Sequence, residues 1–142
     1  MPQVMFYQLS AGAHSAAQRA CELVADAYAR KQKVTVMCES QTLAEDVDEL
    51  LWQLPAARFV PHNLHGEGPP AGTPVEICWQ VSQLSRRPLI VNLGDTMLPN
   101  PQQYQRIIDF VPADDAEKQA ARVRYKKYQQ AGCNMQFTAA EN

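Results

Sequence analysis

Five cationic side chains gather within ten residues near the end of the sequence, and they are the group best suited to binding chemistry. They give residues 118–127 a charge of +5, because this segment holds no acid. The rest of the chain holds 8 basic and 15 acidic residues, a net charge of −7. A charge distribution of this kind repels polyanions broadly but offers one docking place for an anionic segment. The five cations are Lys118, Arg122, Arg124, Lys126 and Lys127.

Three of these cations form a row if the segment is a helix. Lys118, Arg122 and Lys126 are four residues apart, so their side chains rise from one stripe, which we call the basic row. Tyr125 borders the row. We expect the packed side of the helix to be apolar positions elsewhere on its surface, namely Ala116, Ala120, Val123 and Ala131. Two interpretations remain open at this point: a binding stripe for something acidic, or a solvated face whose cations favour the helix dipole.

Motifs of enzymatic chemistry are sparse. The first strand-to-helix turn, residues 10–14, has one glycine and no lysine, whereas a phosphate loop needs several close backbone amides and usually a lysine. Ser82 and Ser85 lack the GxSxG context of a serine nucleophile. The acids are scattered over predicted helix surfaces. We therefore expect no catalytic residue and no cofactor.

Residues 62–67, from His62 to Glu67, are the strongest candidate for metal chemistry. Two histidines three apart with a nearby glutamate could ligate zinc in a hydrolase. The segment has no HExxH pattern, and its Gly- and Pro-rich surroundings favour side chains that hydrogen-bond the turns of a long loop. Four cysteines are spread along the chain without a CxxC pair, and we expect reduced, packed thiols and no metal: Cys21, Cys38, Cys78 and Cys133.

Two aromatic residues near the middle of the chain are a second candidate for binding. Trp52 lies on a predicted helix whose inner face is already filled by leucines, and Phe59 follows just past the end of that helix. Burial in the core is one interpretation. The other is an exposed aromatic pair, which is what a protein–protein hot spot requires.

The elements that must position these residues alternate between strand and helix. Extended runs rich in β-branched residues are interrupted by helical periodicity, which is typical of an α/β layered domain. The predicted strands are 4–9, 33–38, a piece beginning at Phe59, 75–79, 88–93 and 106–111; the predicted helices are 16–31, one ended by Pro55, and one from about Pro112 to Gly132. We expect the tail after about residue 135 to be frayed.

The length of 142 residues fits one domain, 1–142. The sequence has no signal-peptide succession at its start and no run of 18 apolar residues, so we expect a cytoplasmic protein without a membrane span.

Several segments together resemble the chi subunit family of bacterial DNA polymerase III. The resemblance covers nearly the whole chain in order and spacing. It is carried by Phe6-Tyr7, residues 50–52 (LLW), 59–69 (FVPHNLHGEGP), 74–79 (PVEICW), 109–112 (DFVP), 124–126 (RYK) and Gly132. The chain departs from the family at Gln80–Pro88, which is shorter and less basic, and at His65, where a small residue is common.

The resemblance implies a fold and a set of partners. The fold would be a single three-layer α/β/α domain with a mostly parallel central sheet, of nucleotide-binding-like shape without a P-loop. The partners would be the psi subunit, which links the chain to the clamp-loader complex, and the C-terminal tail of single-stranded-DNA-binding protein. That tail ends in acids, proline, phenylalanine and a free carboxylate. A helicase-like partner competing with psi is left open, and DNA would be contacted only indirectly.

Carried over by position, the resemblance assigns residues to two sites. The psi-facing site would be Trp52 and Phe59. The tail-binding site would be Val111, Lys118, Arg122, Tyr125 and Lys126. A basic helix that binds DNA directly remains the alternative function.

Overall fold

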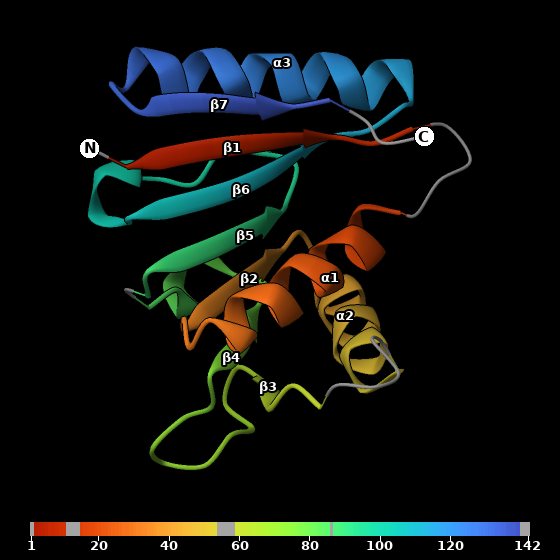
Figure 1. Ribbon diagram of the computed structural model, residues 1–142, viewed down its shortest axis with the longest axis vertical. Coiled ribbons are helices and arrows are strands. Elements are labelled where there is room, and N and C mark those ends of the chain that lie inside the picture. The colour runs from red at the N-terminus through yellow and green to blue at the C-terminus, as the bar shows by residue number, and fades with distance from the viewer. Residues whose placement is uncertain (1, 11–14, 54–58, 86, 140–142) are drawn as a thin grey trace.

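A single sheet with helices on both faces forms the molecule (Figure 1). The computed structural model describes residues 2–10, 15–53, 59–85 and 87–139. Within these residues the sheet has seven strands in the order β3-β4-β2-β5-β6-β1-β7. The six strand pairings found among them are all parallel. The α/β fold and its parallel sheet are therefore confirmed.

The elements follow one another largely as the alternating pattern predicts. In chain order they are β1 (Gln3–Gln8), α1 (Ala16–Ala29), β2 (Val34–Cys38), α2 (Gln41–Gln53), β3 (His62–Leu64), β4 (Val75–Cys78), η1 (Val81–Gln83), β5 (Leu89–Leu93), η2 (Pro101–Gln103), β6 (Arg106–Val111), α3 (Asp115–Gln130) and β7 (Asn134–Thr138). The third strand is shorter than expected and begins at His62 rather than Phe59.

Adjacent residues of the central strands belong to different cores, which defines three layers. Val91 packs in a cluster with residues of α1 and α2, whereas its neighbour Ile90 packs in a cluster with residues of α3. Successive side chains of a strand point to opposite faces. Helices α1 and α2 therefore cover one face and α3 the other, and Figure 1 places α3 beside β7 and β1, away from α1 and α2.

Local signals fix the starts of the first two helices. The Ser15 hydroxyl accepts from the Gln18 backbone amide at 3.2 Å, and the Gln18 side chain accepts from the Ser15 amide at 3.0 Å, which completes a capping box. Ser40 accepts from the Leu43 amide at 3.1 Å at the start of α2. The turn at 11–14, where a phosphate loop was sought, and the predicted stop at Pro55 lie outside the described residues.

The C-terminal segment is a strand and not a frayed tail. Gly132 follows the C-cap of helix α3 at φ +88°, and the Cys133 amide donates to the Tyr128 carbonyl at 3.2 Å, the pattern of a Schellman stop. The predicted glycine stop is thus confirmed. The chain then turns back into β7, which pairs with β1 from Gln3↔Asn134 to Tyr7↔Thr138. The expectation of fraying after residue 135 is therefore wrong for residues 136–138, and residues 140–142 lie outside the described part of the chain.

The four cysteines are buried and free, as predicted from their spacing. Within the described ranges, no helix is both long and apolar enough to cross a membrane.

Candidate functional site

Helix α3 carries the basic row, and its charges are ordered along its axis. The Asp114 carboxylate caps the helix by accepting from the Glu117 amide at 3.1 Å, and the first turn holds two acids, Asp115 and Glu117. The cations start at Lys118. Acids near the N-terminus and cations toward the C-terminus both stabilise the helix dipole. The sequence therefore folds this segment as a helix whose outer surface becomes positive after its first turn.

The basic row faces solvent. Arg122 and Lys126 are exposed and Lys118 is half-buried. In the part of the chain that the structure describes, no ion pair joins any of the three to an acid. The row can therefore meet an external anion without first breaking an ion pair among the described residues.

The packed side of α3 differs from the prediction. Its buried residues are Ala121, Arg124 and Tyr128. The four positions predicted to pack, Ala116, Ala120, Val123 and Ala131, are all exposed. The prediction failed because it assigned the packed side to alanine and valine positions alone, whereas an arginine and a tyrosine supply much of it. Tyr128 is fully buried, and its hydroxyl accepts from the Leu98 amide at 2.8 Å.

Arg124 is held by a buried carboxylate. Its Nε and Nη2 donate to the two carboxylate oxygens of Asp109 at 3.0 and 3.1 Å, and Nη2 also donates to the Phe110 carbonyl at 3.1 Å. This bidentate pairing is the strongest geometry for a guanidinium and a carboxylate. Arg124 is therefore a structural residue, and the +5 counted from the sequence overstates the surface charge of the helix by one.

Burial and hydrogen bonding act on Asp109 in opposite directions. Complete burial raises the pKa of Asp109 to about 6, while the Arg124 guanidinium, the Phe110 amide and the Asn92 side chain favour the charged form. At neutral pH the carboxylate is thus ionised and paired. One sequence signal pointed to this pair: Asp109 interrupts the otherwise apolar run of β6, and a buried acid needs a partner.

Val111 and Tyr125 lie at the border between the core and the surface. Both are partly buried against the cluster beneath α3. The Tyr125 ring packs against Phe6 with 5.2 Å between centroids. Val111 is the last residue of β6, and Tyr125 follows Arg122 by three positions. The structure thus puts two partly buried apolar side chains on the same side of the sheet as the basic row.

Trp52 and Phe59 lie against each other and are exposed. Their ring centroids are 5.5 Å apart, and their exposed fractions are 60% and 63%. Trp52 also stacks edge-on against His62 at 5.0 Å. Large apolar side chains with this much exposure mark a contact surface more often than a core. We refer to Trp52 and Phe59 as the aromatic pair.

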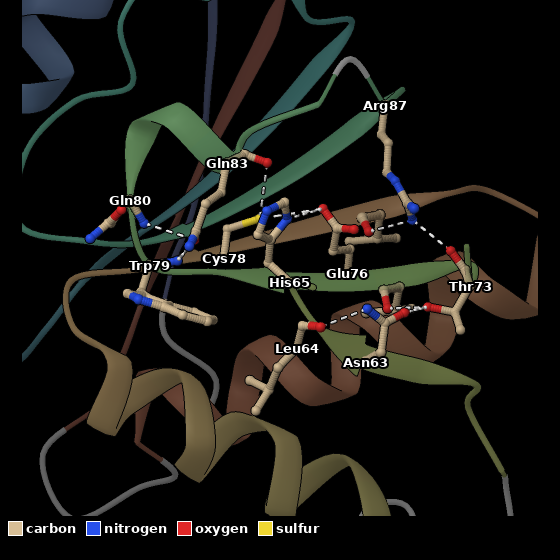
Figure 2. Close-up of polar contacts among 12 residues, drawn as sticks. Asn63, Leu64, His65, Thr73, Glu76, Cys78, Trp79, Gln80, Gln83 and Arg87 are labelled. Carbon is tan, nitrogen blue, oxygen red and sulfur yellow. Dashed lines mark hydrogen bonds and ion pairs between the residues drawn. The ribbon is translucent and has the colours of Figure 1, made fainter. Parts of the chain in front are cut away.

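The two histidines of the 62–67 segment do not share a site. The His62 side chain is fully buried, and its ring nitrogens lie 2.7 Å from the Val60 carbonyl and 3.1 Å from the Asp48 carbonyl of α2. The imidazole of His65 instead lies 3.4 Å from the Glu76 carboxylate, on the opposite face of the sheet (Figure 2). The structure therefore does not bring both histidines to one metal, as the hydrolase alternative supposed.

A pocket at the carboxyl ends of β5 and β6 is poorly suited to a nucleotide. Its volume is about 180 Å³, below the roughly 300–1,000 Å³ of ordinary ligand sites. The lining includes four acids, Glu39, Asp95, Asp109 and Glu117, against one cation, the already paired Arg124. A phosphate group there would meet mainly negative charge.

Comparison with known families decides the kind of protein. The family model described as DNA polymerase III chi subunit, HolC, matches residues 1–136. The chain belongs to the DNA polymerase III chi subunit family. Membership of this family places it in the DNA polymerase III complex and in DNA replication.

Individual chi subunits support the same family. DNA polymerase III subunit chi of Escherichia coli (strain K12) is 42% identical over 125 residues, which cover 87% of this chain and 85% of the relative. The Haemophilus influenzae subunit of the same name is 44% identical over 117 residues, covering 82% and 81%. The Pseudomonas aeruginosa subunit is 29% identical over 140 residues, covering 96% and 95%.

A solved structure shows the likeness of fold. The crystal structure of T4 UvsW superposes with a TM-score of 0.66 over 96% of this chain at 9% sequence identity. The chain spans only 41% of that protein. At this level of identity the likeness concerns the fold alone.

Proposed function

We propose that this chi-family chain is a non-catalytic accessory subunit that joins the psi subunit to the C-terminal tail of single-stranded-DNA-binding protein, in the cytoplasm. The observation that carries the proposal is the presence of two separate exposed surfaces of different chemistry. One is the basic row on α3, and the other is the aromatic pair at the end of α2.

The two surfaces belong to helices that cover opposite faces of the sheet, which supports binding of both partners at once. Helix α2 packs over β2, β3 and β4 on one face of the sheet, whereas α3 packs over β6 and β7 on the other. An adaptor needs this arrangement, because one partner must not displace the other. Through psi, the chain would connect the tail-bearing protein to the clamp-loader complex.

The proposed tail site combines charge with an apolar slot. Arg122 would pair with the terminal carboxylate of the tail through a bidentate fork, and Lys118 and Lys126 would attract the upstream acids. Val111 and the Tyr125 ring would contact the terminal phenylalanine. Each exposed ion pair contributes only about 0–1 kcal/mol, so specificity must come from the fork and the slot acting together.

A titration with a labelled tail peptide tests this site. We expect the free-acid peptide to bind with an affinity that falls as salt rises, because the basic row is exposed to screening. The same peptide with an amidated end should bind at least tenfold more weakly, since the fork loses its anion. Equal affinity for both peptides would refute the proposed site.

The same experiment separates direct DNA binding from tail binding. An oligonucleotide that bound this chain alone, with a steep salt dependence, would favour the DNA-binding alternative. We expect negligible binding, because three cations in a row contact few phosphates and the rest of the chain is acidic.

The aromatic pair is tested separately with the psi subunit. Trp52→Ala and Phe59→Ala should each abolish co-elution with psi on gel filtration, since truncating a hot-spot aromatic costs about 2 kcal/mol or more. Phe137→Ala is the matched control, because Phe137 is also an exposed aromatic, at 54%, but lies on β7 at the other end of the sheet. A helicase-like partner that uses the aromatic pair would compete with psi in this assay.

A further inference from the structure

Three side chains with different metal-binding donors converge at the β3–β4 edge of the sheet (Figure 2). They are His65, Glu76 and Cys78, and their donor atoms all lie within 4.8 Å of one another. Glu76 and Cys78 are two apart on β4, so they point to the same face. The register of β3 and β4 places His65 beside these two residues. The His65 amide continues the pairing of the strands by donating to the Ile77 carbonyl at 2.8 Å.

Two of the three donor separations match those of a tetrahedral ion. Bonds of about 2.0–2.3 Å to zinc at tetrahedral angles hold neighbouring donor atoms about 3.3–3.6 Å apart. The His65 Nδ1 lies 3.4 Å from Glu76 Oε1, and the Cys78 Sγ lies 3.6 Å from the same oxygen. Two edges of the tetrahedron are therefore already present without any movement of the chain.

We propose that His65, Glu76 and Cys78 form a binding site for a divalent zinc-type cation. A thiolate with an imidazole selects zinc over magnesium or calcium, which prefer oxygen donors. The three protein ligands would occupy three tetrahedral positions and leave the fourth for water, on the side where His65 is exposed to solvent. This site lies at the sheet edge opposite β7 and is independent of the proposed tail-binding surface.

The surrounding residues hold one of the ligands, Cys78, in place. Cys78 is buried, and its thiol lies 3.6 Å from the Gln83 carbonyl of η1. The Gln83 side chain in turn accepts from the Trp79 and Gln80 amides at 2.9 and 3.2 Å, which fixes the turn after β4 (Figure 2). Preorganised ligands of this kind reduce the cost of ordering a site on binding.

A nearby cation opposes metal binding but is already engaged. Arg87 donates to the backbone carbonyls of Val34, Thr73 and Pro74 at 3.2, 2.8 and 2.9 Å. These bonds hold its guanidinium at the amino-terminal ends of β2 and β4, whereas Cys78 ends β4. The charge balance at the donors remains favourable, because the bound site would contribute a carboxylate and a thiolate.

Binding requires one proton to leave. Burial and the Glu76 carboxylate raise the pKa of the Cys78 thiol to about 12, so the metal-free residue is a thiol. On binding, the S–H bond breaks, the sulfur–metal bond forms, and the proton passes to solvent. No oxidant or reductant is involved.

Cobalt(II) titration of the untagged, chelator-treated full chain tests the site. We expect one equivalent of Co²⁺ to give tetrahedral d–d absorption and a thiolate-to-cobalt charge-transfer band, both removed by one equivalent of Zn²⁺. Cys78→Ser should abolish the charge-transfer band. Cys133→Ser is the matched control and should keep it, because Cys133 is a buried cysteine beside β7.

A variant of the exposed ligand distinguishes loss of a ligand from misfolding. His65→Ala removes a half-exposed side chain, so the far-ultraviolet circular dichroism should be unchanged while Zn²⁺ affinity falls at least tenfold, the lower end of what even outer-shell changes cost. One equivalent of Zn²⁺ should raise the midpoint temperature of thermal unfolding of the wild type and of Cys133→Ser, but not of the two ligand variants. Absence of the charge-transfer band in the wild type, its survival in Cys78→Ser, or unchanged affinity in His65→Ala would each overturn the proposal.

Discussion

The two faces of α3 use the same residue type for opposite purposes. Arg122 on the outer face is exposed and has no ion pair within the described residues. Arg124, two positions on, is buried and makes a bidentate pair with Asp109. The outer face is thus available for a partner, and the inner face fixes the helix to the sheet.

The contrast shows that charge alone does not identify a binding residue. A guanidinium in water gains little from a single contact, whereas one in the core must be fully bonded. The inner pair also has a positional effect on the outer face, because the Asp109–Arg124 bonds fix how α3 sits on β6. The rotation of the helix, and with it the direction of the basic row, depends on that pair.

The inner face should dominate stability. Asp109→Ala would leave the Arg124 guanidinium buried without its counter-charge, and we expect the free energy of unfolding to fall by about 3–5 kcal/mol. Urea unfolding followed by circular dichroism measures this. Arg122→Ala is the control and should change stability by less than about 0.5 kcal/mol.

A double substitution sharpens the same test. Asp109→Leu combined with Arg124→Met should recover most of the lost stability, because apolar groups of similar volume replace a buried pair at little cost. If Asp109→Ala alone were as stable as the wild type, the structural role of the pair would be disproved.

The free energy of unfolding should change with pH because of the titration of the Asp109 carboxyl group. Its folded pKa of about 6 lies above the ordinary value of 3.8, so between these values the folded state holds more protons than the unfolded state. The pH-dependent part of the free energy of unfolding is therefore largest below about pH 4 and falls as the pH rises through about 6, while the Arg124 pairing stabilises the ionised form that remains.

Comparison with a non-titrating variant isolates this effect. As the pH rises from about 4 to about 6, the free energy of unfolding of the wild type should fall relative to that of Asp109→Asn. Asp114→Asn is the control, since it removes an exposed carboxylate and Asn is an equally good helix cap. Parallel curves for the wild type and Asp109→Asn would contradict the prediction.

The outer face should dominate binding. Removing a charge-assisted hydrogen-bonding group costs about 1.5–3 kcal/mol, so Arg122→Ala should weaken tail-peptide binding about 10- to 150-fold in a fluorescence-polarisation titration. Arg122→Lys keeps the charge but loses the bidentate pairing, so its affinity for the tail peptide should lie between those of the wild type and Arg122→Ala. Wild-type affinity in Arg122→Ala would remove the basis for the proposed fork.

The lysines of the basic row should have the smallest effects. Lys118→Ala and Lys126→Ala should each cost about 0–1 kcal/mol of binding free energy. These losses should disappear near 1 M salt, where the screening length is about 3 Å. Lys127→Ala provides a charge-matched control outside the row. A lysine effect that persisted at high salt would indicate a specific hydrogen bond instead.

The sequence was sufficient for the parts of the fold that have strong periodicity. Strands β2 and β5 are apolar runs, α3 has an acidic start and a glycine stop, and these elements were predicted within a few residues of their observed ends. Strand β7 was missed because it is an edge strand with only one partly buried apolar residue, Met135, so its pattern resembles a polar tail.

The candidate sites were less predictable where they depend on contacts between distant residues. The row Lys118–Arg122–Lys126 follows from helical spacing alone. The inner face of α3 does not, because a propensity argument places Arg124 on the surface and only the buried Asp109 reverses this. Convergence of His65 with Glu76 and Cys78 depends on the register of two strands separated by a ten-residue loop, for which the sequence carries no local signal.

The place of β1 in the sheet has a consequence for synthesis. Among the described strands, β1 is made before the others and pairs with β6 and β7, the last two of them. Roughly a hundred residues separate Gln8 from Arg106, and translation at about 5–20 residues per second delays their pairing by about 5–20 s. During that interval the amino-terminal segment has no strand beside it, so nascent chains stalled before β6 should be substrates for chaperones.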